Sequence, residues 1–325
     1  MEKIATGMLA KGSMKMKYDR RQFLFAGGAA ALASGCVSAA RDRESPARGP
    51  RPSTFHVFSK MFQPPVTPSP EALCELMKGA GYDGIQWTVR KKGHVAPENA
   101  KTELPRLCKI ARSFGLGCDT ICTDVKPGDE TAETVLKTAA DCGIALQRPA
   151  YFFYDAKTET FAQSLDRIRR GFGWLADLAE KTGVKATYQN HSSWGPSVFG
   201  GLVWDVYECV KDLDPKYVGL EYDPMHAFFE TNLSWSHGFE LVAPWIAAID
   251  LKDFHYQPDP KNPKKMKKAM VAAGEGVVPW NEVKALQERN GVRVPYVVHF
   301  EYAFDRTDLP KSVKTELDAF RRLLA

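Results

Sequence analysis

Four segments in the second half of the sequence each end an apolar run with side chains that bind cations or transfer protons. They span residues 186–191, 218–226, 246–253 and 296–301. Each pattern predicts a buried strand whose last residues are polar. Carboxylates and amides suit hard divalent ions, imidazole widens the choice of metal, and carboxylates or imidazoles also transfer protons. The four segments therefore predict a site for a metal or a sugar.

The polar residues near each predicted strand end share a face, because side chains two residues apart point the same way. This alternation pairs Asp223 with Glu221, Asp250 with Lys252, and Glu301 with His299. If the four strands are neighbours, their ends converge. The predicted metal ligands are the donors nearest the strand ends, namely Gln189, Asp223, Asp250 and Glu301.

Two more residues are predicted to take part in the chemistry. His226 follows Asp223 by three residues and is a candidate ligand or acid, and Lys252 is a candidate partner for an oxyanion. Each has a structural alternative. Asp223 could cap a following helix, His226 could be a hydrogen-bonded core residue, and Lys252 could form an ion pair inside the rim. His299 is expected one layer deeper than Glu301, in a supporting role.

The elements that must position these residues alternate between strand and helix patterns. The predicted strands cover 54–58, 84–89, 116–123, 145–153, 185–190, 218–222, 246–251 and 296–300, and the predicted helices cover 71–80, 104–114, 132–142, 158–181, 204–212, 238–242, 280–289 and 309–324. Such alternation predicts a parallel sheet, and eight repeats close most simply into a (β/α)8 TIM barrel. A doubly wound sheet is disfavoured because no Gly-rich phosphate turn follows the first strand.

Several motifs carry a family resemblance. They are Asp223-Pro-Met-His226, Leu251-Lys252-Asp253, Gly274-Glu-Gly-Val-Val-Pro-Trp280 and a last strand ending in Glu301. From about Phe55 onward the chain resembles the sugar phosphate isomerase/epimerase proteins of the xylose-isomerase-like barrel superfamily. The resemblance implies a carbohydrate substrate and a divalent ion such as Mn, Mg, Co or Zn. Because barrels of this family often pair, it also makes a homodimer an expectation.

The resemblance also assigns roles to the predicted ligands. In the family's epimerases and isomerases the metal is commonly held by Glu, Asp, His and Glu, and the two Glu residues move the proton. Here Gln189 stands where Glu is expected and Asp250 where His is expected. Gln cannot act as a base, so we expect one base, Glu301 or a nearby His such as His226.

Three functions follow from this pattern. The first is a metal-dependent isomerase, epimerase or lyase that works through an enediolate held by the metal and Lys252. The alternative is a carbohydrate-binding barrel that has lost its metal and its activity, which the two departures favour. A DNA-repair endonuclease of the same superfamily ranks last, because such enzymes use a richer His/Glu cluster.

Residues 88–98 look like a second-strand loop found in a subset of the family. Arg90 and His94 on this loop are predicted to contact substrate, as are Trp87 and His191. Solvated loop charges are the alternative for Arg90 and His94, and core packing is the alternative for Trp87.

The N-terminus reads as a targeting segment. Arg20 and Arg21 precede Phe23-Leu24 and a short small-residue run, which resembles a twin-arginine export signal. We therefore expect a signal at 1–40, a linker at 41–53, a barrel at 54–325 and export to the periplasm. Lipidation at Cys36 is a weaker alternative, and the apolar run is too short for a stable membrane span.

Composition narrows the remaining classes. Hydrophobic residues make up 44% and charged residues 26%, which is ordinary for a globular protein. The net charge of +5 comes largely from the first 51 residues and from the run 261–268, which is expected to be a solvated loop. This does not make the broad basic face that nucleic acid requires. The seven cysteines lack metal or redox spacing, so buried free thiols are expected.

Overall fold

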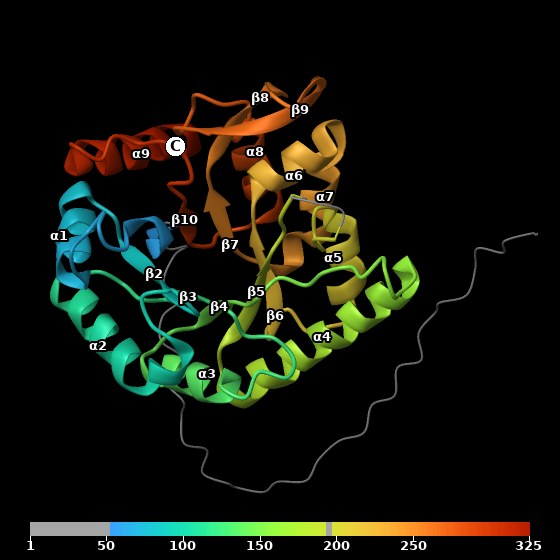
Figure 1. The fold of residues 1–325 in the computed structure, drawn as a ribbon, viewed down its shortest axis with the longest axis horizontal. Coiled ribbons are helices and arrows are strands. Elements are labelled where there is room, and N and C mark those ends of the chain that lie inside the picture. Colours follow the sequence, from blue (N-terminus) through green and yellow to red (C-terminus); the bar gives the residue numbers. More distant parts are fainter. Residues whose placement is uncertain (1–52, 193–196) are drawn as a thin grey trace, which may run out of the picture. The chain divides into compact units, whose positions relative to one another are not determined.

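The computed structural model describes residues 53–192 and 197–325 of the chain. The predicted export signal, and the linker except for Ser53, lie outside these residues. From Phe55 onward the chain forms the predicted barrel, in which eight parallel strands close on themselves. Figure 1 shows the helices arranged around these strands.

The barrel strands are β1 (Phe55–Phe58), β2 (Gly84–Val89), β3 (Thr120–Thr123), β4 (Leu146–Arg148), β5 (Lys185–Gln189), β6 (Val218–Tyr222), β7 (Ile246–Leu251) and β10 (Tyr296–Val298). Closure comes from β1, which pairs in parallel with both β2 and β10. Because every strand is buried on both faces, the sequence runs are apolar almost throughout. Among the polar side chains of these strands, Gln86 and Thr187 bond to Glu221 inside the barrel.

The helices are α1 (Pro70–Ala80), α2 (Ala100–Ser113), α3 (Ala132–Asp141), α4 (Phe161–Thr182), α5 (Val203–Val210), α6 (Pro224–Thr231), α7 (Trp235–Val242), α8 (Trp280–Asn290) and α9 (Leu309–Leu324). Their ends follow local sequence signals. At α4, Thr160 and Gln163 form a reciprocal capping box, and Gly183 ends the helix in the left-handed conformation. At α6, the Asp223 side chain accepts from the His226 amide.

Two parts of the fold differ from the sequence-based expectation. A helix, α6, directly follows β6, where no helix was predicted. The run 261–268 is not a loop, because β8 (Asp253–Asp259) and β9 (Asn262–Val271) form an antiparallel hairpin after β7. The hairpin packs on α6, where Phe229 stacks on Tyr256 with ring centroids 5.7 Å apart. It therefore adds a wall beside the carboxyl ends of the strands (Figure 1).

The described cysteines lie in the core. Cys74, Cys108, Cys118, Cys122, Cys142 and Cys209 are all buried and unpaired by disulfides. This confirms the expectation of buried free thiols for these six. Within the residues that the structure describes, no helix is long and apolar enough to cross a membrane.

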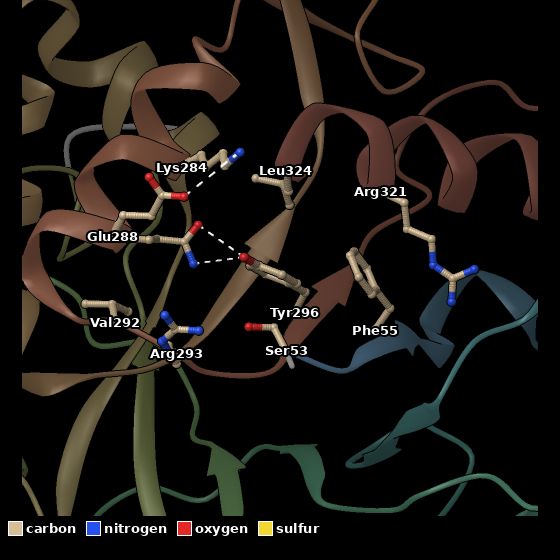
Figure 2. Close-up of a pocket in the computed structure, with 10 residues that line it drawn as sticks. Ser53, Phe55, Lys284, Glu288, Val292, Arg293, Tyr296, Arg321 and Leu324 are labelled. Carbon is tan, nitrogen blue, oxygen red and sulfur yellow. Dashed lines mark hydrogen bonds and ion pairs between the residues drawn. The ribbon is translucent and has the colours of Figure 1, made fainter. Parts of the chain in front are cut away.

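The opposite end of the barrel holds a separate cavity of about 270 Å³. Figure 2 shows its lining at the starts of β1 and β10, where Phe55 and Tyr296 lie. The Gln287 amide donates to the Tyr296 hydroxyl at 3.0 Å. Active sites of such barrels lie at the carboxyl ends of the strands, which is the end away from this cavity.

Candidate active site at the carboxyl ends of the strands

A buried ammonium joins two of the predicted ligands. Lys252 Nζ lies 3.0 Å from Asp223 Oδ2 and 3.1 Å from Glu301 Oε2. The side chains of Lys252 and Asp223 are 2% and 0% exposed, whereas Glu301 is 24% exposed. Lys252 comes from the end of β7, and its partners come from the ends of β6 and β10. Glu301 is therefore the member of this group that solvent or substrate can reach.

The charge states of this group follow from its contacts. Burial alone would lower the pKa of Lys252, but Asp223, Glu301 and Asp250 outweigh burial and raise it well above its ordinary value. Burial alone would raise the pKa of Glu301, but Lys252, His299 and Lys60 bring it well below its ordinary value. The site thus contains a permanent ammonium beside an ionised carboxylate.

Gln189 reaches the same group through its amide nitrogen. Nε2 donates to Asp223 Oδ2 at 3.0 Å and to Asp250 Oδ2 at 2.6 Å. Its Oε1 accepts a hydrogen bond from the Tyr151 hydroxyl. The residue that replaces the family's Glu therefore donates to two carboxylates and has its own oxygen already engaged.

A second layer of charge lies deeper in the lumen. Arg148, on β4, has its guanidinium 3.5 Å from Glu221 Oε1 and 3.7 Å from Asp250 Oδ2. Gln86 Nε2 donates to both oxygens of Glu221 at 3.0 Å. His299 Nε2 lies 3.2 Å from Asp250 Oδ1. All of these side chains are buried, so their charges must be balanced within the layer.

The two carboxylates of this deeper layer have raised pKa values. Burial, and then repulsion from Asp250, raises the pKa of Glu221 to about 8. Burial also raises the pKa of Asp250. Burial, and then repulsion from Lys252, lowers the pKa of His299 to about 3, so its ring is neutral and can act as a ligand. Two carboxylates that share one cation attract a proton or a second cation.

The two layers differ in how well they fit a divalent ion. In the outer layer, Lys252 and Gln189 already donate to Asp223, Asp250 and Glu301, so the four predicted ligands do not present free oxygens to one point. In the deeper layer, one ligand atom each from Glu221, Asp250 and His299 lies within 4.8 Å of the others. Asp250 Oδ1 and His299 Nε2 face each other at 3.2 Å, and neither of them, nor His299 Nδ1, has a hydrogen-bond partner elsewhere. Two carboxylates and an imidazole therefore form a possible metal site.

The predicted His226 lies beside the outer layer. Its Nε2 is 3.5 Å from Asp223 Oδ2, and its Nδ1 is 2.7 Å from Ser192 Oγ. The His191 ring packs against it with centroids 3.8 Å apart. Burial, and then the charge of Lys252, lowers the pKa of both imidazoles. Both rings are therefore neutral hydrogen-bonding groups at the mouth.

The other predicted substrate contacts divide into two groups. Arg90 lies at the rim, with its guanidinium 5.8 Å from the centroid of Phe58. His94 is held by Ser59 and Thr88, at 3.2 and 3.0 Å from its Nδ1. Trp87 belongs to the hydrophobic core and is 0% exposed. Its neighbours on β2 face the lumen, so Trp87 faces the helices and the predicted substrate contact does not fit.

Sequence reasoning did not single out two cations of this site. Arg148 is the charged residue of the predicted strand 145–153, and a charge within a strand that is expected to be buried is a usable signal. Lys268 was assigned to a solvated run, but it is half-buried, and its Nζ donates to Ser192 Oγ. No local signal separates Lys268 from its neighbours, because only the packing of the hairpin turns it inward.

The fold and site can be compared with known proteins. Residues 74–323 match the model of the xylose isomerase-like TIM barrel family, so the chain belongs to that family. No curated protein matches the sequence.

Three solved structures illustrate the likeness. A D-psicose 3-epimerase from Clostridium cellulolyticum H10, solved with D-tagatose, is 13% identical with a TM-score of 0.63, covering 83% of this chain and 99% of that one. A 3-keto-D-glucoside 4-epimerase from E. coli has the same identity and coverage and a TM-score of 0.62. A xylose isomerase-like barrel from Mycobacterium smegmatis, in complex with magnesium, is 15% identical with a TM-score of 0.59, covering 84% and 98%. At these identities the likeness shows the shared fold.

Proposed function

We propose that this chain is a carbohydrate isomerase that moves a proton between two carbons through an enediolate. The observation that carries the proposal is the pair of Lys252 and Glu301 at the barrel mouth, with their charged atoms 3.1 Å apart. Membership of a family whose fold is shared by sugar epimerases supports a sugar as the substrate.

Glu301 is the proposed base. Its carboxylate is ionised and partly exposed, so it can remove a proton from the carbon next to a sugar carbonyl. Lys252 then stabilises the negative charge that develops on the carbonyl oxygen. Because Asp223 also holds the ammonium in place, this positive charge is present before substrate arrives. Neutral His226 and His191 can hydrogen-bond sugar hydroxyls beside it.

The proposal favours isomerisation over epimerisation. Epimerisation exchanges a proton between opposite faces of one carbon and is commonly served by two bases. Gln189 stands at the position of the second base and has no basic group. A single carboxylate can instead take a proton from one carbon and return it to the neighbouring carbon on the same face, while the hydroxyl proton passes from one enediolate oxygen to the other.

We further propose that Glu221, Asp250 and His299 hold a divalent ion. These residues fit a divalent ion because their ligand atoms converge in a buried lumen, where Asp250 Oδ1 and His299 Nε2 face each other at 3.2 Å with no other partner. When bound, such an ion supplies positive charge that polarises a substrate oxygen. Metal analysis of protein purified without chelator, compared with a His299→Ala variant, tests the site directly. An equal metal content in both proteins would argue against it.

Deuterium exchange tests the function. In D2O, NMR should show deuterium entering a carbon next to the carbonyl of a ketohexose or aldohexose during its conversion. Glu301→Gln should slow this by about 10²- to 10⁴-fold, the usual contribution of a general base. Glu75→Gln, on the exposed face of α1, is the matched control.

Two outcomes contradict the proposal. Exchange that is as fast in Glu301→Gln as in the wild type rejects Glu301 as the base. Sugar binding by calorimetry with no exchange at any carbon would instead support the non-catalytic carbohydrate-binding barrel, which the Gln189 substitution favours.

A further inference from the structure

The hairpin of β8 and β9 points one lysine into the mouth of the barrel. Lys268 on β9 pairs with Tyr256 on β8, and Tyr256 stacks on Phe229 of α6. The Lys268 ammonium lies 4.9 Å from the centroid of the Phe229 ring. Its neighbour Lys267 is on the other face of the strand and is exposed. The hairpin thus presents one basic residue to the site and the rest to solvent.

The contacts of Lys268 leave its charge uncompensated. Its Nζ donates to the hydroxyl of the buried Ser192, which lies 2.7 Å from His226 Nδ1. Lys60 and Lys252 each form an ion pair with Glu301. In the described part of the chain, no carboxylate lies within ion-pair distance of Lys268. An ammonium has three protons, and Ser192 accepts one of them.

The surroundings of Lys268 favour an incoming anion. Burial, and then repulsion from Lys252, lowers its pKa, while Asp223, Glu230 and Glu301 are more distant opposing charges. An anion in contact with Lys268 would offset both the loss of solvation and the repulsion. Ser192 links Lys268 to His226, so this anion would lie next to a ring that is proposed to bind sugar hydroxyls.

We propose that Lys268 binds a carboxylate carried by the substrate, which makes the substrate a sugar acid such as a ketouronate. This inference rests on the proposed function, because it places a carbohydrate in the same mouth. A carboxylate suits one ammonium with two free protons and a neighbouring ring. A phosphate carries more charge and more oxygens, and it usually requires several converging donors.

Binding of a matched pair of sugars tests the inference. D-tagatose and D-tagaturonate differ by a hydroxymethyl group and a carboxylate at one carbon. Calorimetry should show that the wild-type protein binds the uronate about tenfold or more tightly, as expected for one charge-assisted hydrogen bond. Lys268→Met should remove this preference and leave D-tagatose binding within about twofold. Lys268→Arg should retain much of it, and Lys267→Met should change neither affinity.

Several results would overturn the inference. They are equal affinity of the wild type for the two sugars, no binding of either, or equal losses for both sugars in Lys268→Met. Tighter binding of D-tagatose 6-phosphate than of the uronate would also reject a carboxylate site. Failure of the proposed function is distinguishable, because then the uronate preference persists without deuterium exchange.

Discussion

Lys252 is the residue on which the outer layer depends. Its ammonium is buried between Asp223 and Glu301, a position that leaves no room for a divalent ion on the same two carboxylates without strong repulsion. The family motif of Leu-Lys-Asp therefore has a local explanation in this chain. The lysine supplies fixed positive charge at the mouth. In the deeper layer, the Arg148 guanidinium lies 3.5 Å from Glu221 and 3.7 Å from Asp250, so the proposed ion would share these two carboxylates with it.

Removal of Lys252 should destabilise the fold. Lys252→Met leaves the buried Asp223 without its cation, so we expect a loss of about 3–5 kcal/mol in the free energy of unfolding. Adding Asp223→Asn should recover part of the loss, because the orphaned charge is removed. Urea denaturation measures both. Lys60→Met is the matched control, since Lys60 also pairs with Glu301 but is 46% exposed, and it should cost under about 1 kcal/mol. Equal costs for the two lysines would contradict the burial argument.

Glu316 on α9 should make stability depend on pH. Its Oε2 accepts from the Tyr302 hydroxyl at 2.8 Å and the Ala273 amide at 3.2 Å, and its Oε1 has no partner. Burial raises its pKa from 4.5 to about 7. Because the folded state binds this proton more tightly than the unfolded state, stability falls as pH rises from about 4.5 to about 7. The penalty above that range is of the order of 3 kcal/mol.

The Glu316→Gln variant isolates this effect. Gln keeps an acceptor for Tyr302 and cannot ionise, so the variant should be more stable than the wild type above pH 7. The difference should shrink to nearly zero toward pH 4.5. Denaturation curves across this range measure it, with the exposed Glu288→Gln as the control. A stability difference that does not change with pH would contradict the assignment.

At the scale of elements, Asp253 ties the hairpin to the barrel. Its carboxylate accepts from the amides of Gly274 and Val278 and from Trp280 Nε1, at 3.0–3.2 Å. A Cβ on Gly276 would lie 2.0 Å from Asp253 Oδ1, so only glycine fits there. This explains why Leu251-Lys252-Asp253 and the Gly-Glu-Gly to Trp280 segment occur together. One motif is the acceptor and the other is its donor loop.

Removal of the Asp253 carboxylate should destabilise the segment that follows the hairpin. Asp253→Ala leaves the buried Val278 amide and Trp280 Nε1 unpaired, together with the Gly274 and Phe254 amides, and we expect a cost of about 3–5 kcal/mol. Asp253→Asn should cost less, because an amide oxygen still accepts. The control is Asp259→Ala at the exposed hairpin tip, which should cost under about 1 kcal/mol. Urea denaturation compares the three variants, and equal losses in Asp253→Ala and Asp259→Ala would refute the role of Asp253.

The sequence predicts the bounds of a strand well where both faces of the strand are buried, and less well elsewhere. The predicted ranges of β2, β6 and β7 match the structure, because fully buried strands leave continuous apolar runs. β4 ends at Arg148, five residues before its predicted end, because Pro149 cannot donate to the ladder. The β8–β9 hairpin could not be predicted, since its lysine-rich strand shows no apolar alternation. Its inward face is set by packing on Phe229.

At the scale of the whole molecule, barrel closure explains why the sequence could predict which residues meet. It does not determine which of their atoms pair. Strand order brings Gln189, Asp223, Asp250 and Glu301 into one network, as alternation and parallel packing require. Arg148 and Glu221 lie 73 residues apart and still meet in the lumen. Alternation alone cannot say which of several polar atoms pair. Lys252 was expected to bind an oxyanion or to form an ion pair inside the rim, but the sequence did not show that its partners are Asp223 and Glu301.

The buried thiols of the barrel are relevant to the compartment in which the protein folds. Burial raises the pKa of Cys74 and Cys209 to about 12, so neither forms an appreciable thiolate inside the folded barrel. A chain that folds before it meets an oxidising compartment would keep such thiols reduced. The twin-arginine route carries folded proteins, and we propose that Arg20 and Arg21 direct this chain into it.

Fractionation of cells that express the full chain tests this route. Arg20→Lys/Arg21→Lys should hold the protein in the cytoplasm, whereas Arg41→Lys/Arg43→Lys in the linker should not. Exported protein should show its six core thiols to a thiol reagent only after denaturation, because all six are buried and free. Export of the paired-lysine variant at the wild-type level would reject the signal. Fewer than six thiols in the denatured exported protein would mean that oxidation reached the chain before folding protected it.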